Sequence, residues 1–524
     1  MDDQKAKAPA ISDPPPNQTL ALEKPKKPPR NKYALACATL ASMISILSDG
    51  AVMSGASVFI QKYLKINDTQ VEILAGIINP FALVGSIAAG RTSDWIGRHY
   101  TIIFAAAIFL AGALLMGLAP NYAILMVGRL VAGVGIGYAL MIAPVYTAEI
   151  APTSSRGFLT SFPEVFINVG ILLGYVSNLA FAKLPDHLNW RIMFCVGAVP
   201  PIFVAIAVLA MPESPRWLVM QGRLGEAERV LAKTSDTPEE AQLRLLEIKE
   251  AAGIPENCND EVVAESKKNH GEGVWKDLLL RPTPSVRRIL IAAIGLQFFQ
   301  QASGIDSVVL YSPRVFEKAG LKSDSNSLGA TVAVGFMKTA AILVATFLLD
   351  RVGRRPLLLS SAGGMVISLV ILASSLSVIE HHPHEKLTWA AAMSISTVLT
   401  FVGSFSIGLG PIAWVYTSEI FPLRLRAQGA SLGTATNRIV SGVISMTFIS
   451  LYKTITIAGS YFFYAGIAAA GWLFFYFFLP ETRGRSLEDM EVLFGKKPEG
   501  GEEEKVEAEV VHRGGEDSNA KTEV

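Results

Sequence analysis

The chain has 524 residues, of which 51% are hydrophobic and only 17% charged, and its mean hydropathy of +0.39 is higher than water-soluble domains usually show. Its formal net charge of +1 offers no basic field for nucleic acid, and its three cysteines lie too far apart for a disulfide framework or a zinc site. This composition argues against a soluble enzyme and against a nucleic-acid-binding protein.

The N-terminal segment, residues 1–32, is polar, rich in proline and lysine, and lacks the apolar core of a signal peptide, so we expect a disordered tail. From Tyr33 onward, apolar runs of about twenty residues alternate with short polar breaks, and each run is long enough to cross a ~30 Å hydrocarbon core as a helix. Twelve transmembrane helices are predicted, at 33–60, 71–90, 101–118, 122–147, 158–181, 191–211, 287–312, 327–349, 356–379, 389–417, 427–451 and 458–479.

The predicted helices form two halves of six, residues 33–211 and 287–479, separated by a polar segment at 212–286. An even number of spans places both termini on one side of the membrane. Because the tails and the polar segment are rich in lysine and arginine, we expect that side to be the cytoplasm. The acidic segment 480–524 is predicted to be a second cytosolic tail.

The polar segment between the halves also carries helix signals. Thr237 to Glu240 reads as a capping box with proline at the first helical position. Leu243, Leu246 and Ile248 give the following turns an apolar stripe. We therefore expect amphipathic cytosolic helices between the two membrane halves.

The two halves repeat each other in three short motifs at corresponding places. The pairs are Tyr146–Pro152 with Tyr416–Pro422, Asp94–Arg98 with Asp350–Arg354, and Pro212–Glu213 with Pro480–Glu481, at offsets of 270, 256 and 268 residues. A duplicated six-helix unit is the plan of a transporter whose binding site lies between the halves.

From Tyr33 to about Phe494 the chain resembles the sugar porter family of the major facilitator superfamily. The motifs that carry the resemblance are Gly90–Arg98, Gly128–Arg129, Pro212–Arg216, Gln300–Ile305, Gly410–Trp414 and Pro480–Gly484. Within that family it looks most like the plant polyol/monosaccharide transporters, through Val52–Ala56, Phe162–Glu164, Gly273–Leu278, Arg281–Pro284 and Leu425–Gly433. The resemblance implies an all-α membrane protein that imports linear polyols and related sugars with protons, as a monomer in the plasma membrane and without a further cofactor.

Ionisable residues inside a membrane span are costly, so each is a functional candidate with a partner to be found. Six such residues within the predicted spans are taken as candidates: Asp49, Arg129, Glu164, Asp306, Lys338 and Arg438. Three acids balance three bases, which indicates a paired interior that gains one charge when a proton enters.

Asp49 and Arg129 are the candidates for proton coupling. Asp49 lies 17 residues beyond Lys32, and Arg129 lies eight residues beyond Asn121, which places both in the outer half of the membrane. Separation of such a pair during alternating access would let the carboxylate take up a proton. The resemblance implies this role, since proton-coupled family members carry an Asp and an Arg at these positions. The alternative is a permanent ion pair that fixes the first span on the fourth.

Gln300 and Gln301 are the first candidates for substrate binding. They lie roughly 18 Å into their span, near the midplane, and just before Gly304, where the helix is expected to break. Amide side chains offer the donors and acceptors that hydroxyl groups require. The resemblance adds Trp414 and Asn437 to the substrate site, although Trp414 also suits an interfacial aromatic belt.

Four further positions depart from the hexose-transporter pattern that the resemblance implies. Glu164 replaces a Gln, Asp306 replaces an Asn, Tyr311 is left alone where two tyrosines are usual, and Lys338 occupies a place that is usually uncharged. Charged acceptors and donors suit an open chain of hydroxyls, so these residues are assigned to substrate binding. An equally weighted alternative is that Asp306, Lys338 and Arg438 only neutralise one another.

Charged residues at the cytoplasmic ends of the spans are predicted to form a gate of salt bridges that locks the outward-open state, as the resemblance implies. They are Asp94, Arg98, Glu149, Arg156, Asp350, Arg354, Glu419 and Arg426. The alternative is solvated surface charge.

Two other functions remain open from the sequence. One is a facilitative carrier for hexoses or inositol, and the other is a sugar sensor that does not transport. An enzyme is the weakest hypothesis, because no nucleophile with a base and no metal-ligand cluster is apparent.

Overall fold

The computed structural model describes residues 31–47, 50–152, 156–252, 254–255, 278, 280–319, 324–382, 387–421, 425–482 and 493–494. Within these ranges no side chain is described at 47, 50–51, 156–157, 250–252, 324–325, 350, 418–419, 426–427 and 430. The two predicted tails lie almost wholly outside the described residues.

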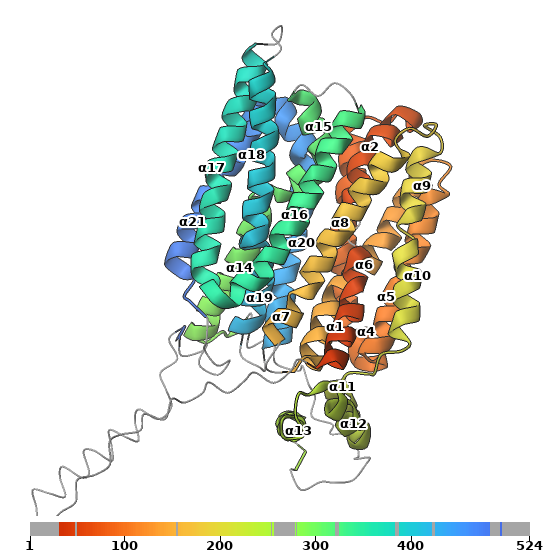
Figure 1. The fold of residues 1–524 in the computed structure, drawn as a ribbon, viewed down its shortest axis with the longest axis vertical. Coiled ribbons are helices and arrows are strands. Elements are labelled where there is room, and N and C mark those ends of the chain that lie inside the picture. Colours follow the sequence, from red (N-terminus) through yellow and green to blue (C-terminus); the bar gives the residue numbers. More distant parts are fainter. Residues whose placement is uncertain are drawn as a thin grey trace, which may run out of the picture.

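The first half of the chain is a bundle of helices (Figure 1). Its helices are α1 (Lys32–Ser42), the 3₁₀ helix η1 (Met43–Leu47), α2 (Gly50–Leu64), α3 (Asp68–Gly76), α4 (Ile78–Ile96), α5 (Arg98–Gly117), α6 (Tyr122–Ile150), α7 (Arg156–Thr160), α8 (Phe162–Phe181), α9 (Asn189–Val196) and α10 (Val199–Val208).

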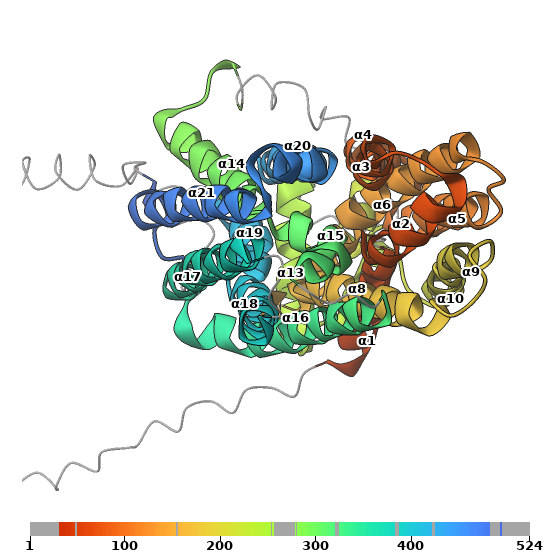
Figure 2. The ribbon, with the colours of Figure 1, turned by 90° about the horizontal axis from the view of Figure 1, so that it is seen from above.

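The second half is a similar bundle that lies beside the first, and Figure 2 shows the two from above. Its helices are α14 (Pro284–Ala302), α15 (Ile305–Lys318), α16 (Asp324–Val352), α17 (Arg354–His381), α18 (Thr388–Ile407), α19 (Leu409–Ile420), α20 (Arg426–Ile455) and α21 (Ile457–Phe478). The short helices α11 (Pro215–Met220), α12 (Leu224–Thr234) and α13 (Pro238–Ala252) connect the halves and lie below the bundle in Figure 1. We call this the linker end, and the opposite one the distal end.

Nine of the predicted spans appear, within the described ranges, as helices or helix pairs long and apolar enough to cross a bilayer. The other three correspond to the predictions at 33–60, 287–312 and 427–451. The first contains the undescribed residues 48–49, the second is broken between α14 and α15, and the third is the polar helix α20. Interruption and polarity mark segments that line a pathway rather than face lipid.

Two helix breaks have clear local causes. Gly304 has a φ of +85° and a ψ of 16°, a left-handed conformation that ends α14 and starts α15, as the sequence predicts. Pro411 has no N–H to donate to the carbonyl of Ile407, four residues earlier, and α18 ends at that residue. Leu409 N–H instead donates to Ser361 Oγ at 3.0 Å.

The linker helices pack as a small unit around Leu218, Leu224 and Ala227. The predicted start of α13 is confirmed: Glu240 N–H donates to Thr237 Oγ1 at 3.2 Å, and the Glu240 carboxylate accepts from Asp236 N–H at 2.9 Å.

The predicted apolar stripe of α13 is wrong in two of its three positions. Leu243 and Leu246 are exposed, whereas Leu245 and Ile248 pack against the cluster. The physical reason is that Arg244 turns inward and donates to the carbonyl of Glu149 at 3.1 Å. The buried face of α13 therefore runs through Arg244, Leu245 and Ile248, and Leu243 and Leu246 are left exposed.

Candidate functional site

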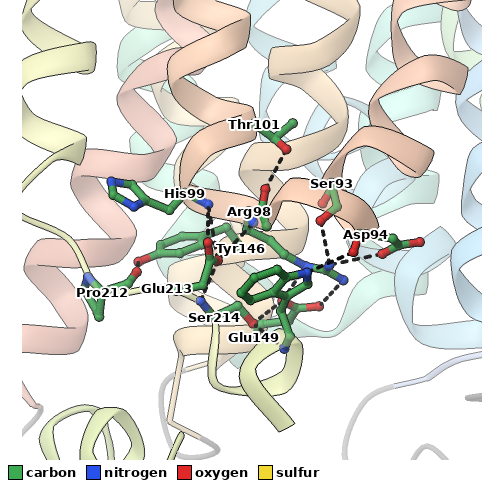
Figure 3. A network of polar contacts seen from close by, with 12 residues as sticks. Ser93, Asp94, Arg98, His99, Thr101, Tyr146, Glu149, Pro212, Glu213 and Ser214 are labelled. Carbon is green, nitrogen blue, oxygen red and sulfur yellow. Dashed lines mark hydrogen bonds and ion pairs between the residues drawn. The ribbon is translucent and has the colours of Figure 1, made fainter. Parts of the chain in front are cut away.

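The start of α5 is held by a polar network at the linker end (Figure 3). Gly97 has a φ of +94°, and the Glu213 carboxylate accepts from the backbone N–H groups of Arg98 at 2.9 Å and His99 at 3.2 Å. A Cβ at Gly97 would lie 2.3 Å from Glu213 Oε2. The carboxylate therefore caps the helix at a place that only glycine leaves open.

The Arg98 side chain joins two of the predicted gate residues. Its guanidinium lies 3.0 Å from Asp94 Oδ1 and 3.2 Å from Glu149 Oε2. Ser214 Oγ donates to the same Glu149 carboxylate at 2.5 Å. Burial raises the pKa of Glu213, partly offset by the hydrogen bonds it accepts from Ser214, His99 and Arg98 backbone groups.

The second half repeats this network. The Glu481 carboxylate accepts from the N–H groups of Arg354 at 3.0 Å and Arg355 at 2.9 Å, beside Gly353 with a φ of +104°. Tyr416 Oη donates to the carbonyl of Pro480 at 3.1 Å. In the first half, Tyr146 Oη likewise donates to the carbonyl of Pro212 at 2.8 Å. The three sequence repeats thus meet in one motif in each half.

The structure therefore places Asp94, Arg98 and Glu149 together, with Arg354 in the corresponding position of the second half. The side chains of Arg156, Asp350, Glu419 and Arg426 lie outside the described residues. Glu213 and Glu481 were not predicted as gate residues. Their recurrence after Pro212 and Pro480 was the signal that could have identified them.

At the distal end a second polar cluster connects the two halves. Asp68, at the start of α3, accepts from Gln61 Nε2 at 2.7 Å and from Arg314 Nη1 at 3.4 Å, and pairs with Lys453. Arg314 also donates to Gln61 Oε1 at 2.6 Å. Gln61 and Asp68 belong to the first half, whereas Arg314 and Lys453 belong to the second.

A buried carboxylate makes a further contact between the halves. Glu72 on α3 is 1% exposed and accepts from the N–H of Ser450 at 2.8 Å and from its hydroxyl at 2.7 Å. Ser450 lies on α20. This residue was not predicted, although its place inside the span predicted at 71–90 was a usable signal.

Between the two halves lies a cavity of about 120 Å³. Its first-half walls come from α3, α4, α6 and α8, and its second-half walls from α14, α15, α16, α18, α19 and α20. The polar lining residues are Asn79, Glu164, Gln300, Gln301, Asp306, Lys338, Trp414, Arg438, Ser441 and Ser445. The predicted substrate residues Glu164, Gln300, Gln301, Asp306, Lys338 and Trp414 are thus brought together.

A chain of amide side chains lies in the wall of the cavity. Asn437 Nδ2 donates to Gln297 Oε1 at 2.9 Å and to Gln300 Oε1 at 2.6 Å. Gln300 Nε2 donates in turn to the carbonyl of Gly410 at 3.0 Å, and Gln297 Nε2 to that of Ala413 at 3.1 Å. The amides of α14 therefore hold the first turns of α19 after the break at Gly408.

Gln301 differs from Gln300 in how its side-chain amide is hydrogen-bonded. Its Nε2 donates to Asn437 Oδ1 at 3.1 Å, whereas its buried Oε1 has no hydrogen-bond partner in the part of the chain that the structure describes. Gln300 uses both ends of its amide within the protein. Of the two predicted glutamines, Gln301 is the one that offers an acceptor to a ligand.

Four charged residues face the cavity without pairing directly. Glu164 comes from the first half, and Asp306, Lys338 and Arg438 come from the second. Asp306 accepts from the hydroxyl of Ser441, and Lys338 Nζ lies 5.9 Å from the Phe405 ring centroid. The charges of Glu164 and Asp306 act on both cations, but none of the four forms an ion pair with another in the described structure.

Two predicted substrate residues lie behind the cavity wall. Tyr311 is 1% exposed, donates to the carbonyl of Ser445 at 2.6 Å and stacks on Phe448 with ring centroids 5.2 Å apart. Asn437 is 0% exposed and reaches the cavity only through the glutamines and Arg438. Both position other groups rather than line the space.

Of the two residues predicted to couple protons, only one is described. Arg129 on α6 is 0% exposed and donates to the carbonyls of Leu74 at 3.1 Å and Ala75 at 3.2 Å. Asp49 lies outside the described residues. Among the rest of the described chain, no cluster of three or more His, Cys, Asp or Glu could hold a metal ion.

Two pseudo-symmetric helical halves around a polar central cavity define a transporter that works by alternating access. The family model described as "Sugar (and other) transporter" matches residues 34–494, and the chain belongs to this family. The predictions of a major facilitator fold and of a transporter rather than an enzyme are confirmed.

Individual relatives agree with the family. Polyol transporter 5 of Arabidopsis thaliana is 62% identical over 509 residues, which cover 95% of this chain and 94% of that protein. Putative polyol transporter 1 of the same plant is 64% identical over 479 residues, covering 91% and 94%. Among solved structures, the proton:xylose symporter XylE bound to 6-bromo-6-deoxy-D-glucose superposes with a TM-score of 0.73 at 25% identity, covering 88% of this chain and 99% of that one.

Proposed function

We propose that the protein imports linear polyols together with protons across the plasma membrane, acting as a monomer with no further cofactor. The observation that carries the proposal is the composition of the cavity, which is lined by two acidic residues, Glu164 and Asp306, and two basic residues, Lys338 and Arg438, with formal charges that sum to zero. Because these charges cancel, the cavity suits a neutral ligand. Its mixture of donors and acceptors suits hydroxyl groups, and the names of the plant relatives support the same class of substrate.

Proton coupling is assigned to Asp49 and Arg129. Arg129 is fully buried, and a buried cation requires compensation by acceptors or a counterion. Carbonyls of α3 supply part of that compensation, and an ionised Asp49 would supply the rest. Protonation of Asp49 would remove this attraction and allow the halves to rearrange. The proton symport named for XylE supports this assignment.

Alternating access then requires gates at both ends. We place the linker end in the cytoplasm because of its lysine and arginine content, so that both termini are cytosolic. The network around Arg98 and Arg354 acts at the cytoplasmic gate. At the outer side, the contacts of Asp68 and Glu72 with the second half hold the gate closed.

The substrate class is tested by counterflow in proteoliposomes. Vesicles preloaded with sorbitol should take up labelled sorbitol, and mannitol, xylitol, inositol and hexoses are then added as competitors. Stronger competition by linear polyols than by ring sugars supports the proposal. Efficient competition by glucose alone would identify a hexose carrier, and absence of any counterflow would favour a sensor.

A further inference from the structure

Arg438 is a cavity residue whose guanidinium is only partly used within the described protein. Its guanidinium donates from Nε at 3.1 Å, and also from Nη2, to Oδ1 of Asn437. A guanidinium carries five N–H groups, so three remain after these two bonds. They have no hydrogen-bond partner among the described residues, and the side chain lines the cavity. Arg438 therefore presents donors to a ligand.

An acceptor shares its anchor, Asn437, with these donors. Gln301 Nε2 donates at 3.1 Å to the same oxygen of Asn437 that Arg438 binds. Gln301 is 6% exposed and lines the cavity, and its buried Oε1 accepts no hydrogen bond from any described residue. A buried acceptor without a partner costs free energy unless a ligand supplies a donor. One atom of Asn437 thus anchors both a donor group and a free acceptor.

The orientation of these amides is fixed at both ends. At one end Arg438 can only donate, and at the other the carbonyls of Leu409 and Gly410 can only accept. Exchange of the oxygen and nitrogen of Gln301 would place its oxygen against the oxygen of Asn437. The free group of Gln301 is therefore an acceptor.

We propose that Arg438 and Gln301 form a subsite that binds one hydroxyl group of the substrate, with Arg438 as a specificity-determining residue. The hydroxyl oxygen accepts from the guanidinium, and the hydroxyl hydrogen is donated to Gln301 Oε1. Only a group that both donates and accepts satisfies the two partners. An alcohol does so, whereas a carbonyl oxygen or a fluorine leaves Gln301 unpaired. This subsite rests on the proposed function and specifies its chemistry.

The test measures binding of a hexitol and of its monodeoxy and monofluoro analogues to the purified full-length protein by calorimetry. The variants are Arg438→Met and, as a matched control, Arg287→Met, whose arginine is exposed on α14. In Arg438→Met, hexitol affinity should fall by roughly 10- to 100-fold, because a hydrogen bond to a charged donor is lost. One deoxy analogue should bind the wild type as weakly as the hexitol binds Arg438→Met. Its affinity should not fall further in Arg438→Met. Arg287→Met should bind like the wild type.

A second variant, Gln301→Ala, keeps the test decisive if Arg438→Met does not fold. At the one position where the wild type prefers the hydroxyl over the fluoro ligand, this preference should shrink by about tenfold or more in Gln301→Ala, because the acceptor of the hydroxyl hydrogen is gone. Equal losses for every analogue in Arg438→Met, or a preference for the hydroxyl that is undiminished in Gln301→Ala, would overturn the subsite alone. A wild type that binds neither polyols nor sugars would overturn the proposed function and the subsite with it.

Discussion

Replacement of Glu72 by glutamine should open the distal end of the transporter. The carboxylate accepts two hydrogen bonds from Ser450 across the interface between the halves, at 2.8 and 2.7 Å, and is 1% exposed. Glutamine can keep both contacts, because its oxygen accepts from the Ser450 N–H and its NH₂ donates to the Ser450 hydroxyl, but both become hydrogen bonds between neutral groups. Replacing two charge-assisted bonds by two neutral ones costs about 1.5 to 3 kcal/mol in the closed state. Once the halves separate, water solvates glutamate and glutamine alike. The population of the closed state relative to the open state should therefore fall by roughly 10- to 150-fold.

Cysteine labelling measures this shift. Leu310 lines the cavity, so Leu310→Cys, in a chain whose Cys37, Cys195 and Cys258 are replaced by alanine, reports access from the distal side to an impermeant maleimide. Labelling should accelerate at least about tenfold with Glu72→Gln if opening limits the reaction. Glu317→Gln, at an exposed glutamate of α15, should leave the rate unchanged. An unchanged rate in Glu72→Gln, in a protein that still transports, would refute the role of this contact.

Three further predictions concern coupling, substrate binding and stability. Asp49→Asn should abolish uphill accumulation but spare exchange, measured as counterflow, and accumulation by that variant would exclude Asp49 as the proton site. Lys338→Ala should damage transport severely by leaving uncompensated negative charge in the cavity. Adding Asp306→Asn should recover part of the transport rate, whereas strictly additive losses would show that the two charges act independently. Glu213→Ala should lower the stability of the protein by about 0.5 to 2 kcal/mol, because two N–H groups at the start of α5 lose their acceptor. The measurement is the Tm of the purified protein, which should fall, and an unchanged Tm would rule out the capping role.

The fold was predictable because a bilayer sets the length of each apolar run, and because the repeated motifs mark the two halves. The breaks within spans were less accessible. Gly304 gave a usable signal, since glycine alone enters the left-handed region freely. The break before Leu409 depends on Pro411 and on Ser361, a residue of another helix, which no local pattern reveals.

The candidate site was predictable by residue type but not by role. Gln297, Gln300 and Gln301 share one helix face through their spacing of three and four residues, yet Gln297 was not predicted. Spacing does not tell which amide is used within the protein and which remains free, because that depends on Asn437 and on the carbonyls of α19. For the same reason Asn437 was expected in the cavity and instead lies behind it.

Charged contacts between the halves escaped prediction for a related reason. Asp68 and Arg314 lie near helix ends, where charge is ordinarily solvated, and the packing of α3 against the second half brings these opposite charges together. The stripe on α13 failed because a single inward-pointing Arg244 shifts the buried face. Both cases depend on tertiary contacts that the sequence pattern does not contain.

The central claim, proton-driven import of a linear polyol, is tested most directly by sorbitol accumulation in proteoliposomes under an imposed inward proton gradient. The account predicts that internal sorbitol rises above the external concentration, and that a protonophore returns it to equality. Uptake that reaches only the external concentration, at the same rate with and without the gradient, would contradict the account and identify a facilitative carrier.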